Sequence, residues 1–205
     1  GVGISVHGSH RIITENTLFA MPEAAIGLVP DVGASYFLPR SPGKVGTYLG
    51  MTGARLKGSD ILYAGIGTAF MSSEKIELLV TRLAETEISS YDDVDAIVAT
   101  LADDPGAAPL DEYRDLIDAA FAENSVEGIC EHLSIIDHEW AKETHAVLMK
   151  MSPISLKVFT EQLHRSANLD FDECMVMEYR IASAILSYDS DFYEGVRAVL
   201  IDKDH

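Results

Sequence analysis

Two carboxylates stand in an otherwise uncharged and largely apolar stretch of this sequence. Glu23 and Asp31 lie between Glu15 and Arg40, and no other charged residue occurs in that interval. A carboxylate in apolar surroundings costs free energy unless something stabilises it. Two of them in one such run therefore indicate a site, in which they could divide general acid and general base roles.

The residues around the two acids favour turns over one continuous helix. Pro22, Gly27, Pro30 and Gly33 punctuate the segment, and the acids are eight residues apart. Turns can bring such separated side chains to one pocket. The alternative for Glu23 is a carboxylate at a helix start after proline, where the helix dipole favours it. The alternative for Asp31 is an ordinary turn residue after proline.

Composition predicts a folded, globular chain. With 205 residues, 47% of them hydrophobic, the chain can form one large domain or a core with an appendage. No window approaches 18 uninterrupted apolar residues, so no transmembrane helix is expected. Cys130 and Cys174 lack a CxxC spacing, which predicts two buried thiols rather than a disulfide framework or a zinc site. The chain begins without Met or a signal peptide, so we expect a missing natural N-terminus and no secretion.

The net charge of −18 is concentrated in the second part of the chain. Residues 1–60 hold five basic and four acidic residues, and the remaining acids lie in residues 61–205. Such an acidic surface predicts no binding to nucleic acid or to anionic membranes. An anionic small ligand is expected to meet the first part. The alternative is that the acidity serves solubility alone.

Local patterns predict a mixed first part and a helical second part. We expect, in chain order, one strand or a strand pair at 11–20, turns at 22–39, a helix at 44–51, and a helix at 60–65 capped by Ser59 or Asp60. Further helices are expected at 73–86, from 110 onward, at 137–150, from Ser152-Pro153, and at 171–187. Residues 85–112 are rich in acids and predict a solvated connection, with an exposed loop at 103–109.

The stretch Phe19-Ala20-Met21-Pro22-Glu23, followed by Gly27, Pro30-Asp31, Gly33 and Leu38-Pro39, resembles the enoyl-CoA hydratase/isomerase (crotonase) superfamily. Within it the chain is most similar to the 3-hydroxyisobutyryl-CoA hydrolase family. Ser5-Val6-His7-Gly8, Glu178-Tyr179-Arg180 and the tail from Glu194 to Asp204 carry that finer resemblance. It implies an α/β fold, with a partial crotonase-type ββα spiral core at residues 1–72 and an all-helical C-terminal extension at 73–205.

Two positions distinguish the hydrolase from hydratases of the same superfamily. Hydratases of the family that this chain resembles use two Glu residues. The resemblance implies that one of them matches Glu23 and that the other would fall at Gly3. Glycine has no side chain and cannot act as an acid or base. Hydratases also have glycine at the position of Asp31. This rearranged pair argues against alkene hydration, which needs a base and a proton donor on the bound enoyl group.

The resemblance further implies a thioester hydrolase of valine catabolism that converts 3-hydroxyisobutyryl-CoA to 3-hydroxyisobutyrate and CoA. Glu23 would attack the carbonyl or activate water, and Asp31 would bind the substrate hydroxyl or help move protons. Gly1 matches the last glycine of a Gly-Gly-Gly run that contributes to an oxyanion hole. CoA is then part of the substrate, and no cofactor or metal is implied. Lys57 and Lys203 could meet phosphates, with solvated lysines as the alternative.

Other functions remain open at this stage. A hydratase or isomerase of the same fold is one rival, and a non-catalytic fragment or interaction module is another. His7 and His10 show no pairing with Ser or Cys in the sequence that would support a triad, so a structural role is predicted for both. Bacterial cytoplasm or mitochondrial matrix is the expected location. Self-association through the helical extension stays open.

Overall fold

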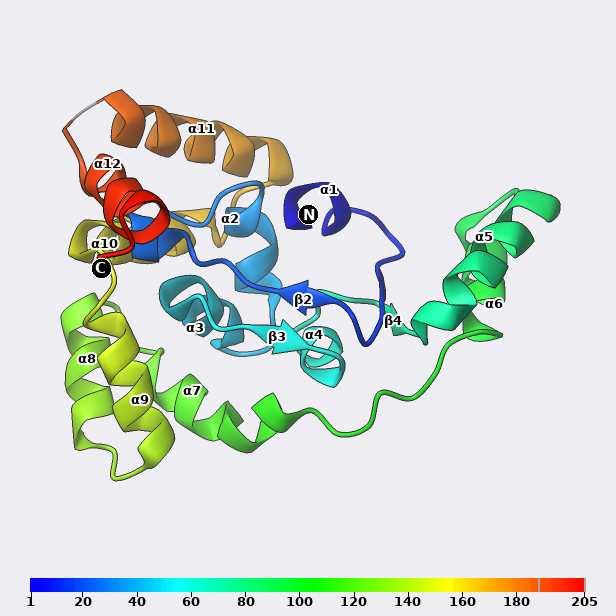
Figure 1. Cartoon of the computed structure of the whole chain (residues 1–205), viewed down its shortest axis with the longest axis horizontal. Coiled ribbons are helices and arrows are strands. Elements are labelled where there is room, and N and C mark those ends of the chain that lie inside the picture. Colours follow the sequence, from blue (N-terminus) through cyan, green and yellow to red (C-terminus); the bar gives the residue numbers. More distant parts are fainter. Residues whose placement is uncertain (188, 205) are drawn as a thin grey trace. The chain divides into compact units, whose positions relative to one another are not determined.

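The computed structural model describes residues 1–187 and 189–204 and contains two compact units (Figure 1). The first unit comprises residues 1–19 and 56–111, and the second comprises residues 20–55 and 112–205. Each unit draws residues from both sides of position 72, and the division into 1–72 and 73–205 stays a prediction. The two carboxylates of interest both belong to the second unit.

The first unit combines four short strands with helices. Its elements are α1 Val2–Ser5, β1 Ile12–Ile13, β2 Leu18–Phe19, β3 Leu56–Lys57, α4 Ser59–Tyr63, β4 Ala69–Phe70, the 3₁₀ turn η3 Ser73–Lys75, α5 Ile76–Glu85 and α6 Tyr91–Ala99. Strand β1 pairs in parallel with β4, and β2 pairs antiparallel with β3. Residues 11–20 thus contain two strands, whereas one strand or a strand pair was expected there. The two strands do not pair with each other, because each pairs with a strand from beyond residue 55.

The predicted capping of α4 is wrong. Gly58 occupies the N-cap position, and no side chain caps this helix. The Asp60 carboxylate instead accepts a hydrogen bond from the Leu110 N–H at 2.8 Å, so it fixes a later loop. An acid next to a helix start can serve either purpose, and only the fold decides which.

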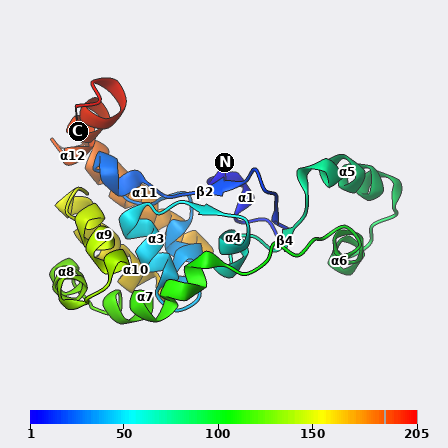
Figure 2. The same ribbon diagram turned by 60° about the horizontal axis from the view of Figure 1, so that its bottom comes forward.

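Helices α5 and α6 form a pair within the first unit (Figure 2). A buried cluster of Met71, Leu79, Val98 and Leu101 holds them together. Part of the predicted acidic connection at 85–112 is therefore the helix α6. Ser90 and Asp93 form a capping box at its N-terminus, where acidic side chains complement the helix dipole. Residues 102–108 have no regular structure, in agreement with the predicted loop.

The regular elements among the described residues of the second unit are all helical. Its elements are the 3₁₀ turn η1 Glu23–Ile26, α2 Ala34–Phe37, η2 Leu38–Arg40, α3 Val45–Thr52, α7 Arg114–Ala120, α8 Val126–Ile135, α9 Glu139–Leu148, α10 Pro153–Ser166, α11 Phe171–Ser187, α12 Asp191–Gly195 and the π-helix η5 Val196–Ile201. The 3₁₀ turn η4 Pro109–Tyr113 leads into α7. Among residues 73–187 and 189–204 there is no strand. The partial spiral core at 1–72 and the helical extension at 73–205 stay predictions.

Helix α3 lies at the centre of the second unit and packs against α7, α9 and α10. Fully buried side chains fill the space between these helices, including Leu49, Ile117, Phe121 and Phe159. The start of α10 follows the prediction, because Ser152 accepts a hydrogen bond from the Ser155 N–H and proline occupies the first turn. Helix α11 spans the predicted residues 171–187.

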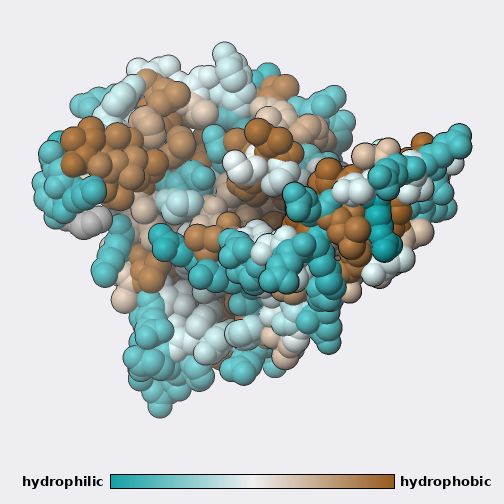
Figure 3. All heavy atoms as spheres, turned by 45° about the vertical axis from the view of Figure 1, so that its right-hand side comes forward, coloured by the Kyte–Doolittle hydropathy of each residue, from teal (hydrophilic) through white to brown (hydrophobic). Residues whose placement is uncertain are grey.

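The surface in Figure 3 is mainly hydrophilic and carries separate hydrophobic patches. Exposed apolar side chains include those of Tyr179, Leu200 and Ile201. Within the described part of the chain, every helix is too short or too polar to cross a membrane. Cys174 is buried as predicted, whereas Cys130 is only half-buried, and both thiols are free.

Candidate active site

Glu23 opens a single 3₁₀ turn whose backbone is fixed on several sides. The turn follows Pro22 and ends at Gly27, which has the left-handed φ of 73°. The Leu28 N–H donates to the Glu23 carbonyl at 3.1 Å, and the Ser152 N–H donates to the Ala24 carbonyl at 3.0 Å. The turn that carries Glu23 is therefore bonded to the beginning of α10.

The C-terminal helix α12 packs directly on this turn. A Cβ atom on Gly195 would lie 2.5 Å from the carbonyl carbon of Ile26, and one on Gly27 would lie 2.4 Å from that of Asp191. Only glycine permits such an approach of two backbones. The Ser152 hydroxyl also donates to the Asp191 carboxylate at 2.6 Å. The Glu194–Arg197 segment, noted above for its resemblance, thus supports the Glu23 turn.

The Glu23 carboxylate is partly buried and incompletely paired. Its pKa is raised from 4.5 to about 7, mainly by burial and to a smaller extent by the charge of Asp31, while a hydrogen bond from its own backbone N–H opposes the rise. The oxygen Oε2 is buried and has no hydrogen-bond partner in the protein. A buried and unsatisfied carboxylate oxygen is unusual in a group that serves structure alone.

Asp31 lies in the loop between η1 and α2, and it is close enough to Glu23 to affect its ionisation. Burial also raises the pKa of Asp31, and the negative charge of Glu178 adds to this effect. Two carboxylates with raised pKa values in one part of the second unit could divide general acid and general base roles. Neither side chain is fully exposed. Their convergence on one site stays a prediction.

Gly1 and Gly3 belong to the first unit. Gly1 is the N-cap of α1, and its carbonyl accepts hydrogen bonds from the Ile4 and Ser5 N–H groups. Gly3 lies inside the same short helix, where it offers no side chain for acid–base chemistry. The role of Gly1 as part of an oxyanion hole stays a prediction.

Sequence reasoning quoted Glu178 without assigning it a role. This carboxylate of α11 is only 3% exposed and accepts hydrogen bonds from the Gly33 N–H, the Ser35 N–H and the Ser35 hydroxyl. Gln162 of α10 donates to the Pro30 carbonyl at 2.9 Å and to the Ser35 hydroxyl at 2.8 Å. Helical periodicity could have predicted that Glu178 is buried, because it lies on the same face of α11 as the buried Cys174.

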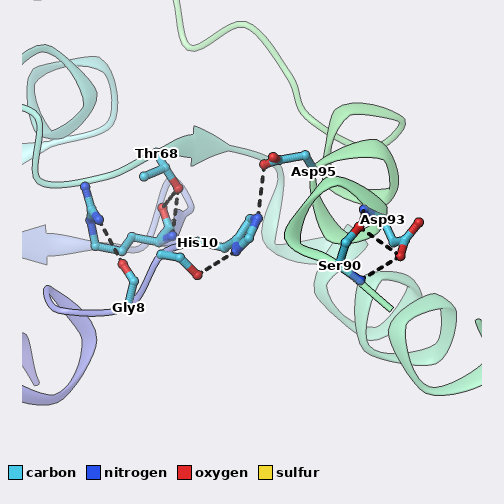
Figure 4. A network of polar contacts seen from close by, with 8 residues as sticks. Gly8, His10, Thr68, Ser90, Asp93 and Asp95 are labelled. Atoms are coloured by element: carbon cyan, nitrogen blue, oxygen red, sulfur yellow. Dashed lines mark hydrogen bonds and ion pairs between the residues drawn. The ribbon is translucent and has the colours of Figure 1, made fainter. Parts of the chain in front are cut away.

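His10 has partners that the sequence did not reveal (Figure 4). Its Nδ1 lies 2.9 Å from the Ser9 hydroxyl, and its Nε2 lies 3.0 Å from a carboxylate oxygen of Asp95. His10 therefore contacts a serine that the sequence pattern did not single out, and its structural role stays a prediction. Ser9 is exposed and the Asp95 side chain is 70% exposed, so water screens the arrangement. The contact joins the segment before β1 to α6, as a structural role requires.

Other candidate sites in the described ranges lack the carboxylate pair. A groove of about 880 Å³ between α10 and α11 has Gln162, Met177 and Arg180 among its lining residues, and neither Glu23 nor Asp31 lines it. In residues 1–187 and 189–204 no three His, Cys, Asp or Glu side chains cluster as metal ligands. The assignment of Glu23 and Asp31 as catalytic residues stays a prediction.

Comparison with known proteins identifies the class to which this fold and site belong. The sequence profile of the enoyl-CoA hydratase/isomerase family matches residues 1–205, and the chain is a member of that family. The crystal structure of a carnitinyl-CoA dehydratase from Mycobacterium thermoresistibile is 36% identical with a TM-score of 0.88, covering 98% of this chain and 57% of that one. An enoyl-CoA hydratase from Rhodobacter sphaeroides is 35% identical with a TM-score of 0.82, covering 99% of this chain and 57% of that one.

The curated relatives point to a particular enzyme within the class. The mitochondrial 3-hydroxyisobutyryl-CoA hydrolase of Xenopus tropicalis is 47% identical over 209 residues, and that of Homo sapiens is 45% identical over 209 residues. Each match covers 100% of this chain and 54% of the relative, so the chain spans about half the length of these proteins. The resemblance stated from the sequence is confirmed.

Proposed function

We propose that this chain is part of an acyl-CoA thioester hydrolase that acts on 3-hydroxyisobutyryl-CoA. The observation that carries the proposal is the Glu23 carboxylate, which is partly buried beside Asp31 with one oxygen unpaired. The similarity to curated 3-hydroxyisobutyryl-CoA hydrolases across the whole chain supports the substrate. Cleavage breaks the C–S bond and adds the elements of water, which yields 3-hydroxyisobutyrate and free CoA.

In this proposal Glu23 supplies the basic or nucleophilic carboxylate. With a pKa near 7 it is largely ionised at slightly alkaline pH, and it is a stronger base than an exposed glutamate. It either takes a proton from the attacking water or attacks the carbonyl to form a transient anhydride, and both routes use the same oxygen. Backbone N–H groups would stabilise the negative charge on the thioester oxygen, and the family resemblance implies one such donor in the glycine run that ends at Gly1.

Asp31 binds the substrate hydroxyl in this proposal. Its partly buried position, with a pKa raised by burial and by Glu178, suits a carboxyl that shares a proton with a bound hydroxyl. The substrate class follows from Asp31, because a carboxylate that hydrogen-bonds the substrate hydroxyl favours acyl chains that carry a hydroxyl over those that lack one.

A thiol-release assay tests the proposal. The intact protein is given 3-hydroxyisobutyryl-CoA, 3-hydroxypropionyl-CoA and crotonyl-CoA, while free thiol and enoyl absorbance are followed in parallel. We expect thiol release from the first two, and a loss of roughly 100-fold or more in turnover for Glu23→Gln and for Asp31→Asn. Near-normal hydrolysis by Glu23→Gln would refute the assignment. Glu143→Gln, an exposed substitution on α9, is the matched control.

Hydration of an enoyl-CoA is the second candidate, because the two solved relatives are a dehydratase and a hydratase. Gly3 counts against it, since the second glutamate of the hydratase pattern would fall at this position. Loss of enoyl absorbance from crotonyl-CoA without thiol release would favour hydration. The names of the curated relatives describe them as mitochondrial. We propose the mitochondrial matrix as the location of this protein, with bacterial cytoplasm as the alternative. Self-association stays a prediction.

A further inference from the structure

A buried carboxylate on α11 is inserted into the loop that carries Asp31. The Glu178 oxygen Oε2 accepts a hydrogen bond from the Gly33 N–H at 2.7 Å. Its oxygen Oε1 accepts from the Ser35 N–H at 2.8 Å and from the Ser35 hydroxyl at 2.6 Å. Short bonds of this kind to a charged acceptor offset the cost of burying it. Glu178 therefore ties α11 to the backbone of Gly33 and Ser35, shortly after Asp31.

The loop adopts a conformation that needs such support. Val32 has a φ of 52°, in the left-handed region that a β-branched residue rarely occupies. A strained backbone of this type persists only where its surroundings hold it in place. Gln162 supplies the other attachment, because its side-chain amide donates to the Pro30 carbonyl. Buried side chains from α10 and α11 thus hold the loop on both sides of Asp31.

We propose that Glu178 is a positioning residue that holds the Asp31 loop in the conformation required for thioester hydrolysis. This inference rests on the proposed function and adds a residue that neither the family resemblance nor the comparisons assign to the reaction. Glu178 does not touch the substrate in this proposal. It acts through Asp31, by fixing the loop and by placing a negative charge nearby.

The electrostatic part of this role can be measured separately from the structural part. The negative charge of Glu178 is the second cause, after burial, that raises the pKa of Asp31. Removal of that charge should lower this pKa. A residue that merely packed α11 against the loop would not change the ionisation of Asp31 in this way.

The substitution Glu178→Gln tests both parts with little change in shape. Glutamine keeps one acceptor oxygen, but its NH₂ group then faces a backbone N–H donor, so one of the two backbone bonds is lost. We expect kcat/KM to fall about 100-fold, as for a reacting group misplaced by about 1 Å. Asp172→Asn, an exposed carboxylate change on the same helix, is the matched control and should leave kcat/KM unchanged.

Carbon-13 NMR of the Asp31 carboxyl, titrated against pH, gives a readout that does not depend on turnover. The midpoint should move to lower pH in Glu178→Gln and stay in place in Asp172→Asn. An unchanged midpoint together with wild-type kcat/KM would overturn the positioning role. Wild-type protein that releases no thiol would instead overturn the proposed function, and the NMR titration would still decide the role of Glu178.

Ser35→Ala keeps the inference testable if Glu178→Gln fails to fold. This change removes the hydrogen bond that the Ser35 hydroxyl donates to Glu178 and the one that it accepts from Gln162. It leaves both backbone donors to Glu178 and the negative charge in place. We expect kcat/KM to fall roughly 30-fold, which corresponds to the loss of two ordinary hydrogen bonds. The Asp31 midpoint should not move to lower pH in this variant. Full activity in Ser35→Ala would contradict the proposed positioning.

Discussion

Replacing Glu23 by glutamine should stabilise the folded chain at alkaline pH even as it abolishes turnover. The reason is the cost of holding an ionised carboxylate in a partly buried position beside Asp31. Glutamine has almost the same shape and no charge. The perturbation therefore removes the electrostatic cost and leaves the packing of the η1 turn nearly unchanged.

The magnitude follows from the raised pKa. A pKa that moves from 4.5 in the unfolded chain to about 7 in the folded chain corresponds to about 3 kcal/mol. Solvent screens part of this, because the side chain is only partly buried, so about 2 kcal/mol is the expected gain. The folded state binds the proton more tightly than the unfolded state does. The cost of Glu23 is thus complete above pH 7 and disappears as the pH falls from about 7 to 4.5.

The assay is urea unfolding of wild type and Glu23→Gln at about pH 8.5 and about pH 4.5. At each pH, the unfolding free energy of wild type is subtracted from that of Glu23→Gln. The two resulting differences are then compared. Contributions from carboxylates that do not interact with Glu23 cancel in this comparison, and the coupling to Asp31 is part of the measured effect. Glu143→Gln on the exposed face of α9 provides a charge-matched control. A stability difference that is the same at both pH values would refute the electrostatic reasoning about Glu23.

Two further predictions concern the support of the Glu23 turn. Gly195→Ala places a methyl group against the backbone of Ile26. We expect the free energy of unfolding to fall by about 1–3 kcal/mol, and kcat to fall with it. An unchanged Tm would contradict the close packing of α12 on η1. Ser152→Ala removes the N-cap of α10 and the hydrogen bond to Asp191, which should cost about 1–2 kcal/mol in urea unfolding. Ser134→Ala, an exposed serine change within α8, is its control and should cost less.

Local sequence patterns were sufficient for most of the helices. The Ser152-Pro153 start, the long helix at 171–187 and the helix near 45–52 agree with the structure, because caps, periodicity and glycine stops act over a few neighbouring residues. The same local reasoning failed at α6. The acids there suggested a solvated connection, whereas a capping box and a buried apolar cluster make the segment a helix.

The partners of the strands were beyond the reach of local patterns. Strand β1 pairs with β4 and β2 pairs with β3, across sequence separations that no periodicity encodes. The cap of α4 shows the same limit, since Asp60 bonds to a distant loop instead of its own helix. Local propensity ranks what a segment can form, and tertiary contacts select among these possibilities.

The sequence by itself determined that Glu23 and Asp31 are two carboxylates in an apolar segment, because residue type and spacing are properties of the chain. Only the tertiary structure decided what surrounds them. Glu178, 145 residues from Gly33, reaches the Asp31 loop, and Gly195 allows α12 to rest on the Glu23 turn. The physical reason is that burial, and the charge felt by a buried carboxylate, depend on groups brought together by packing.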